Sequence, residues 1–158
     1  MACQKSLDDM GLAYVDLYLI HFPISLEFVP FEKRYPPEWF HDPDAANPKM
    51  ELIDVPVMDT WREMEALVDA GMAKNIGVAN FNCQGLRDLV SYAKIKPSVL
   101  QVELHPLLQQ SNLVRYAQSL GIHVTAFSPL GHGLSYWNDK VSSLNEPAVQ
   151  EIAKRTGN

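Results

Sequence analysis

The sequence contains only two cysteines, Cys3 and Cys83, and their spacing matches neither a disulfide framework nor a metal site. It also lacks a run of about 18 apolar residues, so we expect no membrane-spanning helix. The first ten residues contain no apolar core of the kind that signal peptides need. Together these absences favour unpaired thiols in a reducing compartment, and we predict a cytoplasmic protein.

Clusters of basic residues are missing as well. The chain has 13 Lys and Arg residues against 19 Asp and Glu residues, which gives a formal net charge of −6. This balance disfavours nucleic acid and anionic membranes as partners. No G-x-G-x-x-G motif follows any predicted strand, which weakens the case for a doubly wound dinucleotide-binding fold.

The chain does contain one strong strand signal, residues 15–23, with the sequence VDLYLIHFP. Its nearly continuous apolar run predicts a strand that is buried on both faces, as in a parallel sheet covered by helices. The run ends at His21, where α/β folds place catalytic groups, so His21 is the first candidate functional residue. A core histidine bonded to a backbone carbonyl is the alternative at this point.

The segments on either side of this strand differ in character. Residues 2–11 predict an amphipathic helix with Leu7 and Met10 facing inward and Gly11 ending it. Seven prolines between residues 23 and 56 exclude a regular helix or central strand there, and loops of this length are usually functional. The aromatic residues of this loop either wall a pocket or anchor the loop: Phe28, Phe31, Tyr35, Trp39 and Phe40.

From residue 56 onward, helical and strand patterns alternate about every 25 residues, which indicates βα repetition. We predict strands over residues 75–79, 98–103 and 122–127. We predict one helix capped by Asp59 or Thr60, one that begins after residue 82, one capped by Ser111 or Asn112, and one that opens at residues 146–147. The expected inward faces are Trp61, Met64, Leu67 and Val68; Leu86, Leu89, Val90 and Ala93; Leu113, Val114, Ala117 and Leu120; and Val149, Ile152 and Ala153.

Two architectures fit this repetition: a doubly wound open sheet, or a piece of a (β/α)8 TIM barrel. A full barrel needs about 250 residues, so these 158 residues correspond to about four consecutive βα units with two long loops. In a barrel, the polar or unusual residues at the strand ends would share one rim. Each has an ordinary alternative, because Asn80 fits a turn, His105 a structural loop and Phe127 the core. Gln101 is harder to dismiss, since a buried amide must find hydrogen-bond partners.

Four motifs taken together resemble the aldo-keto reductases in order and spacing. They are VDLYLIHFP at residues 15–23, KNIGVANF at 74–81, LQVELHP at 100–106 and AFSPLG at 126–131. The sequence IHFP and the loop sequence FVPFEKRYPPEW at 28–39 are most similar to the xylose-reductase side of the aldose- and xylose-reductase group. The resemblance covers essentially the whole chain.

This resemblance implies a (β/α)8 barrel that transfers hydride from NADPH to the carbonyl of a small aldehyde or ketone. It implies that His21 positions the substrate carbonyl, and that Asn80 and Gln101 hydrogen-bond the nicotinamide carboxamide. Phe127 matches an aromatic position, usually tyrosine, that stacks on the nicotinamide ring. The other matched positions are Ser128 and Leu130 in the pyrophosphate loop, and Phe22 and Trp137 in the wall of the substrate pocket; no metal is implied.

Two features depart from the family pattern. Ala79 replaces a serine or cysteine, which removes one hydrogen bond to the carboxamide and costs about 1 kcal/mol of binding. The family's catalytic Asp, Tyr and Lys and its 2′-phosphate site match no residue here. Tyr14 and Tyr18 lie within the motif around the histidine and therefore cannot be that tyrosine. We therefore expect an incomplete barrel domain over residues 1–158, lacking N-terminal and C-terminal portions and having little activity alone. General acid catalysis contributes about 10²–10⁴-fold to such reactions.

Two other functions are compatible with the same residues. A non-catalytic half barrel would self-associate through its exposed sheet edges. A metal-dependent hydrolase would use His21, Glu103 and His105, of which the last two share a strand face because they are two residues apart.

Overall fold

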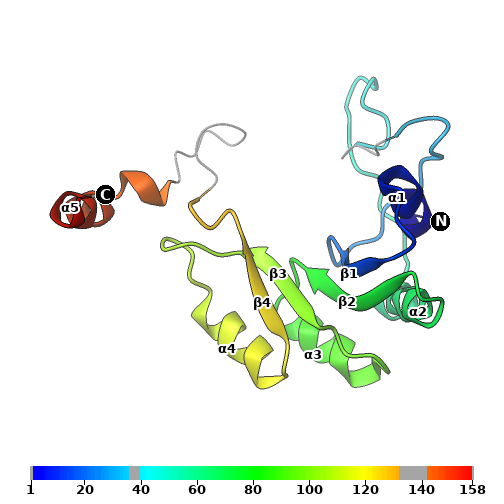
Figure 1. The fold of residues 1–158 in the computed structure, drawn as a ribbon. Helices are drawn as coiled ribbons and strands as arrows, with labels where there is room; N and C mark the ends of the chain where they lie inside the picture. Colours follow the sequence, from blue (N-terminus) through cyan, green and yellow to red (C-terminus); the bar gives the residue numbers. More distant parts are fainter. Residues whose placement is uncertain (1, 36–39, 132–141, 158) are drawn as a thin grey trace.

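The computed structural model describes residues 2–35, 40–131 and 142–157. Within them a parallel four-stranded sheet has the order β1 (Val15–Ile20), β2 (Ala73–Ala79), β3 (Val99–Glu103) and β4 (His123–Phe127). Each strand pairs with its sequence neighbour, and one helix lies between each two successive strands (Figure 1). Such in-order parallel pairing is the arrangement of a (β/α)8 barrel and not of a doubly wound sheet, whose order reverses.

Three helices lie side by side on one face of this sheet (Figure 1): α2 (Val57–Asp69), α3 (Cys83–Tyr92) and α4 (Ser111–Ser119). Their predicted inward faces are confirmed in the main, because Trp61, Leu86 and Ala117 are fully buried between helices and sheet. The sheet contributes Ile76, Val78 and Leu100 to the same core. Burial of the side chains of Ile76, Val78 and Leu100 stabilises the contact between sheet and helices by about 1.5–3 kcal/mol each.

The strand register assigns each residue to one of the two faces of the sheet. Val78 pairs with Leu100, and both point toward the helices. Their neighbours Ala79 and Gln101 also pair, and therefore point to the opposite face, because side chains alternate along a strand. This second face, which we call the inner face, is the more open one: Leu17, Asn75 and Thr125 are exposed on it.

Gly77 allows β2 to approach its two neighbours closely on the inner face. A Cβ atom at this position would lie 2.5 Å from the Val99 carbonyl oxygen and 2.8 Å from Cδ2 of Leu19. Both distances are far below van der Waals contact, and one of them is to backbone that cannot rotate away. The glycine is thus required by packing between strands.

A buried acidic side chain on α2 holds the connection from α3 to β3. Glu65 is buried, and its Oε1 accepts hydrogen bonds from the backbone N–H groups of Lys94 (2.7 Å) and Ile95 (2.9 Å). The indole N–H of Trp61 donates to the Ile95 carbonyl at 3.0 Å. One turn of α2 therefore satisfies three backbone groups that lie 29 to 34 residues away in sequence.

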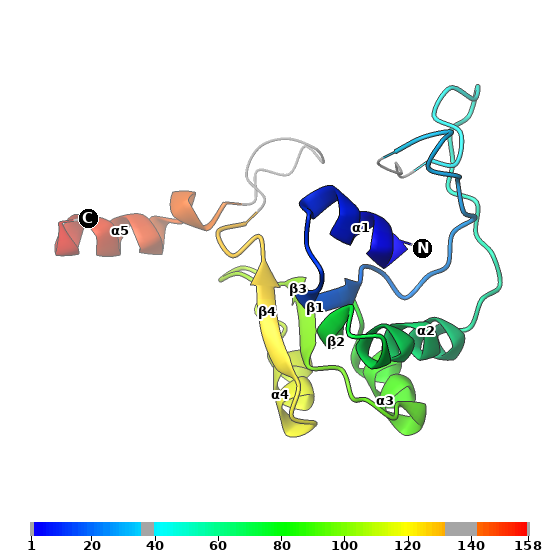
Figure 2. The same ribbon diagram turned by 45° about the vertical axis from the view of Figure 1, so that its right-hand side comes forward.

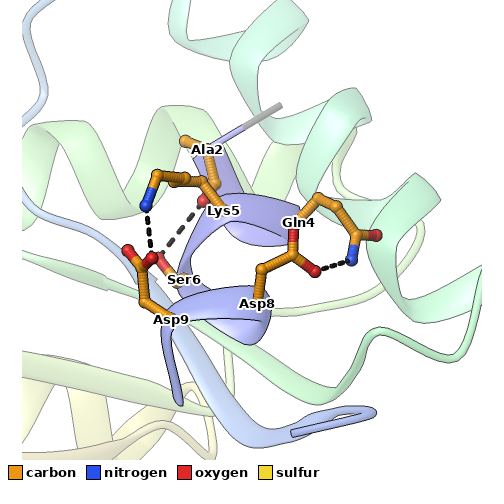
Figure 3. A network of polar contacts seen from close by, with 6 residues as sticks. All are labelled: Ala2, Gln4, Lys5, Ser6, Asp8 and Asp9. Carbon is orange, nitrogen blue, oxygen red and sulfur yellow. Dashed lines mark hydrogen bonds and ion pairs between the residues drawn. The ribbon is translucent and has the colours of Figure 1, made fainter. Parts of the chain in front are cut away.

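Helix α1 (Ala2–Met10) precedes β1 and lies over the β1 end of the sheet (Figure 2). Leu7 is buried at 2% exposure, as predicted, whereas Met10 is 53% exposed, because it lies on the last turn. Gly11 ends the helix with φ 65°, as expected. The outer surface of α1 bears local polar pairs, Lys5 with Asp9 and Gln4 with Asp8 (Figure 3).

The long loop between β1 and α2 is attached to α1 by an aromatic residue. The Nζ atom of Lys5 lies 4.1 Å from the centre of the Tyr35 ring. Tyr35 in turn packs edge-on against Phe31, and Phe31 against Phe28, with ring centres 5.3 and 5.4 Å apart. These contacts support the anchoring role for Phe28, Phe31 and Tyr35. Trp39 lies outside the described residues.

Strand β1 is less buried than predicted. Asp16 and Leu17 are exposed, and the other four residues are only partly buried. The reason is its position, because β1 forms an edge of the described sheet and half of its side chains lie on the inner face. A continuous apolar run indicates that both faces are apolar, but it does not indicate what covers them.

Two helix starts also differ from the prediction. Helix α2 begins at Val57, with Pro56 as N-cap, and makes no side-chain capping bond. The Pro56 carbonyl accepts from the backbone N–H groups of Asp59 and Thr60 at 3.0 and 3.3 Å, so the predicted caps already lie inside the helix. Helix α4 begins after Gln110, which has φ 44° and also makes no capping bond.

The last helix, α5 (Pro147–Thr156), opens with proline as predicted, but its expected inward face is wrong. Ile152 is 50% exposed, and no residue of this helix is buried. Figures 1 and 2 show α5 extending away from the sheet, next to the short 3₁₀ helix η1 (Ser143–Asn145). Its apolar spacing is real, yet the described element that it contacts most is η1, which buries none of its residues.

Candidate functional site

The carboxyl ends of β1, β2 and β3 are connected through one side chain, Asn80. Asn80 directly follows β2, and its Nδ2 donates a hydrogen bond to the carbonyl oxygen of His21, which directly follows β1, at 2.8 Å. Its backbone N–H donates to the carbonyl of Gln101 in β3 at 2.9 Å. Asn80 also has φ 62°, a left-handed conformation that asparagine tolerates better than most residues. Its predicted turn role and its place at the rim are thus compatible.

The carboxyl end of β4 lies beside that of β3. Phe127 is the last residue of β4 and is partly buried, and its carbonyl accepts from the backbone N–H of Leu104 at 3.3 Å. Ser128 follows with φ 48°, and its carbonyl accepts from Gly131 at 2.8 Å. Leu130 in this turn is 55% exposed. Left-handed residues thus follow both β2 and β4, and such strained positions cluster at functional sites.

His21 is exposed, which excludes the alternative of a buried core histidine. Its ring lies 4.3 Å from that of Phe22, centre to centre, at an angle of 31°. Phe22 also lines a cavity of about 320 Å³ between the end of β1 and the start of α2. Ile20 and Val57 line the same cavity, and Ile20 points toward the helices, so this cavity is separate from the inner face.

Gln101 is partly buried and lies on the inner face beside Ala79, its partner in β2. Ala79 is buried at this position and offers no polar group. The inner face at this level therefore carries the amide of Gln101 without the neighbouring hydroxyl or thiol that the family pattern would supply.

Glu103 and His105 form a direct contact, although the sequence predicted only that His105 belongs to a structural loop or that both residues belong to a metal site. Nε2 of His105 lies 3.1 Å from Oε1 of Glu103, and the His105 ring is buried. Among the described residues no group of three or more His, Cys, Asp or Glu side chains is placed to hold a metal ion. The signal for this pair in the sequence was the alternation Glu-x-His at the end of a strand.

The structure therefore places five predicted site residues at the carboxyl end of the parallel strands: His21, Asn80, Gln101, Phe127 and Ser128. Barrels carry their functional residues at this end of the sheet. Leu130 lies in the turn just beyond. Trp137, the other predicted pocket residue, lies outside the described residues. In the part of the chain that the structure describes, no helix has the length and apolar character needed to cross a membrane.

The fold and this edge define a class: a partial (β/α)8 barrel with a polar and aromatic rim. The family described as "Aldo/keto reductase family" matches residues 1–150 of the sequence. The chain belongs to the aldo/keto reductase family, as the resemblance implied.

Individual relatives agree with this assignment. The chain is 53% identical over 131 residues to the NAD(P)H-dependent D-xylose reductase of Pachysolen tannophilus, covering 82% of this chain and 40% of that protein. It is 51% identical over 127 residues to the 4-dihydromethyl-trisporate dehydrogenase of Mucor mucedo, covering 80% and 39%. The chain thus spans less than half the length of these relatives.

Solved structures show the same partial coverage. The aldose reductase of Giardia lamblia superposes with a TM-score of 0.83 and 38% identity, over 99% of this chain and 48% of that one. The aldo-keto reductase of Bombyx mori, solved in complex with NADP, has a TM-score of 0.77 and 34% identity, over 99% and 45%. These likenesses confirm the partial barrel.

Proposed function

We propose that this chain forms the nicotinamide-binding part of an NAD(P)H-dependent reductase that converts a small aldehyde or ketone to an alcohol. The observation that carries the proposal is the pair of hydrogen bonds from Asn80, to His21 across to β1 and to Gln101 across to β3. These bonds hold together the groups that the family resemblance assigns to the cofactor and the substrate.

The chemistry of this rim fits a nicotinamide. Because Nδ2 of Asn80 donates to the His21 carbonyl, its Oδ1 remains as an acceptor for an external N–H group. The amide of Gln101 on the inner face supplies both a donor and an acceptor. A primary carboxamide requires such a combination, and the ring of Phe127 offers a flat apolar surface for stacking.

The bound cofactor would supply the hydride, and the residues of this chain would orient the reactants. The exposed imidazole of His21 would donate a hydrogen bond to the substrate carbonyl oxygen and so fix its direction. Phe22, whose ring lies against that of His21, would form the apolar wall beside it. Ser128 and Leu130 would contact the pyrophosphate through the turn after β4, and Trp137 would complete the substrate wall.

We further propose NADPH as the preferred cofactor and an aldose-like carbonyl compound as the substrate class. The support is the naming of relatives as NAD(P)H-dependent D-xylose reductases and the NADP in the Bombyx mori structure. A cytosolic location is part of the same proposal, because Cys3 and Cys83 are unpaired thiols of the kind that a reducing compartment maintains.

Titration of the purified protein with NADPH, followed by the change in cofactor fluorescence, tests the proposal. Gln101→Ala is expected to weaken binding about tenfold, because it removes the hydrogen bonds of one amide to the carboxamide. Gln84→Ala, which removes an exposed amide on α3, is the matched control and should leave the affinity unchanged. Failure of the unchanged protein to bind NADPH, or equal effects of the two substitutions, would refute the proposal.

A second candidate function is self-association of a non-catalytic half barrel. It is favoured by the described sheet, in which β1 and β4 each have only one neighbouring strand and so present unpaired backbone groups. Two copies of the chain would supply eight parallel strands, the number that closes a barrel. Light scattering distinguishes this candidate, because it requires a discrete dimer that persists on dilution, and a monomer would eliminate it.

A further inference from the structure

The carboxylate of Glu103 lies at the same rim, and the proposed function gives it no role. Glu103 and Phe127 are the last residues of β3 and β4, and they are partners in the strand register. Paired residues on adjacent parallel strands, about 4.8 Å apart, project from the same face of the sheet. Glu103 is therefore next to Phe127 on the inner face, two residues after Gln101 along β3.

His105 holds this carboxylate in place. Its Nε2 lies 3.1 Å from Oε1 of Glu103, and its side chain is 3% exposed, whereas that of Glu103 is 28% exposed. The loop that carries the ring is closed by hydrogen bonds in both directions between the backbones of His105 and Leu108, at 3.2 and 2.9 Å. Gln110 adds a bond from its Nε2 to the Glu103 carbonyl at 2.5 Å.

The hydrogen-bonding state of the ring follows from its burial. Nδ1 of His105 is buried and has no hydrogen-bond partner among the described residues. A second N–H at that atom would be a buried donor without an acceptor, which is costly. An N–H at Nε2, by contrast, has the Glu103 carboxylate as its acceptor. The contact thus holds the Glu103 carboxylate in place at the rim.

We propose that Glu103, held by His105, sets the preference of this site between the two redox forms of the cofactor. The nicotinamide ring is a cation in NADP⁺ and neutral in NADPH, so a fixed carboxylate beside Phe127 stabilises the oxidised form selectively. At a partly exposed site, a charge several ångströms away changes binding by about three- to tenfold. The inference rests on the proposed function, because it requires the ring to stack on Phe127.

Calorimetric titration of the purified protein with NADP⁺ and with NADPH tests the inference without relying on turnover. Glu103→Gln keeps the size of the side chain and an acceptor for His105, but it removes the charge. We expect this substitution to raise the Kd for NADP⁺ about three- to tenfold and to change the Kd for NADPH by less than about twofold. Glu63→Gln, on the exposed side of α2, is the matched control and should change neither.

The outcomes separate the two hypotheses. If the unchanged protein binds neither form, the proposed function fails and the inference fails with it. If both forms bind and Glu103→Gln weakens them equally, the role of Glu103 is structural and the inference alone is wrong. Glu103→Asp, which draws the carboxylate back by one methylene, must lower the selectivity for NADP⁺ in the same direction by a smaller factor. Unchanged selectivity in that variant overturns the inference even if Glu103→Gln does not fold.

Discussion

Single residues decide how the strand ends meet, and Asn80 has two separable roles there. Its left-handed backbone conformation turns the chain at the end of β2, and its side-chain amide reaches the His21 carbonyl. Glycine adopts the same backbone conformation without strain but has no amide, whereas alanine lacks both properties. Comparing the two substitutions therefore separates the turn from the hydrogen bond.

We predict that Asn80→Ala lowers the free energy of unfolding by about 1–3 kcal/mol, since it combines a lost hydrogen bond with backbone strain. Asn80→Gly should be less destabilised than Asn80→Ala, yet both should weaken NADPH binding. Urea denaturation and cofactor titration measure the two effects. Equal stability of the two variants would show that the left-handed conformation at residue 80 has no cost.

The two cysteines should differ in reactivity. Burial raises the pKa of the Cys3 thiol, and Cys3 is 3% exposed, whereas Cys83 at the start of α3 is only partly buried. A raised pKa leaves less of the reactive thiolate at any pH below it. We predict that a thiol reagent at pH 7.5 labels Cys83 much faster than Cys3, and that unfolding in urea removes the difference. Equal rates in the folded protein would contradict the packing of α1.

At the scale of elements, α2 positions other parts of the chain through hydrogen bonds as well as through its apolar face. Glu65 accepts two backbone hydrogen bonds from the segment between α3 and β3, and so fixes where β3 begins. The start of β3 in turn determines that Gln101 pairs with Ala79. A side chain on one helix thereby contributes to the position of a rim residue on a strand that is not adjacent in sequence.

We predict that Glu65→Ala costs about 2–3 kcal/mol of stability, because it leaves two backbone N–H groups without their charged acceptor. Glu65→Gln retains one acceptor oxygen and should cost less. Glu63→Ala, on the exposed side of the same helix, should stay within about 0.5 kcal/mol of the unchanged protein. These differences can be measured by denaturant unfolding. A Glu65→Ala protein as stable as Glu63→Ala would show that the hydrogen bonds of Glu65 do not stabilise the fold.

Sequence patterns predicted the elements better than their surroundings. Apolar periodicity located β1 to β4 and the buried faces of α2, α3 and α4 within a few residues. It failed for Ile152 and for the exposed part of β1, because periodicity reports the apolar character of a face and not the element that covers it. It also missed Glu65, since a single acidic residue on a helix gives no sign of distant backbone partners.

The rim was predictable for a different reason. In a parallel sheet the carboxyl ends of all strands lie at the same end of the sheet, so His21, Asn80 and Phe127 were bound to share one rim once the strands were recognised. The contact between Glu103 and His105 and the bond from Asn80 to His21 depend on loop geometry and rotamers, which no local pattern encodes. Their roles toward a cofactor remain predictions.

For the whole molecule, the chain spans less than half of its relatives, and the resemblance matches no residue here to the catalytic Asp, Tyr and Lys. We predict that residues 1–158 expressed alone reduce xylose or an aromatic aldehyde with NADPH at a rate close to background. The rate of NADPH oxidation measures this. His21→Ala is the control, because any background from a contaminating reductase is unaffected by it. Turnover that depends on His21 would contradict the prediction.

The central claim is that the nicotinamide ring lies against Phe127 at the carboxyl ends of the strands. Nuclear Overhauser measurements between the nicotinamide protons of added NADPH and the ring protons of Phe127 test it most directly. Transfer to Phe127, and its loss in Phe127→Leu, is the predicted result. Binding of NADPH with transfer only to residues at the opposite, amino-terminal ends of the strands, such as Val15 or His123, would contradict the account.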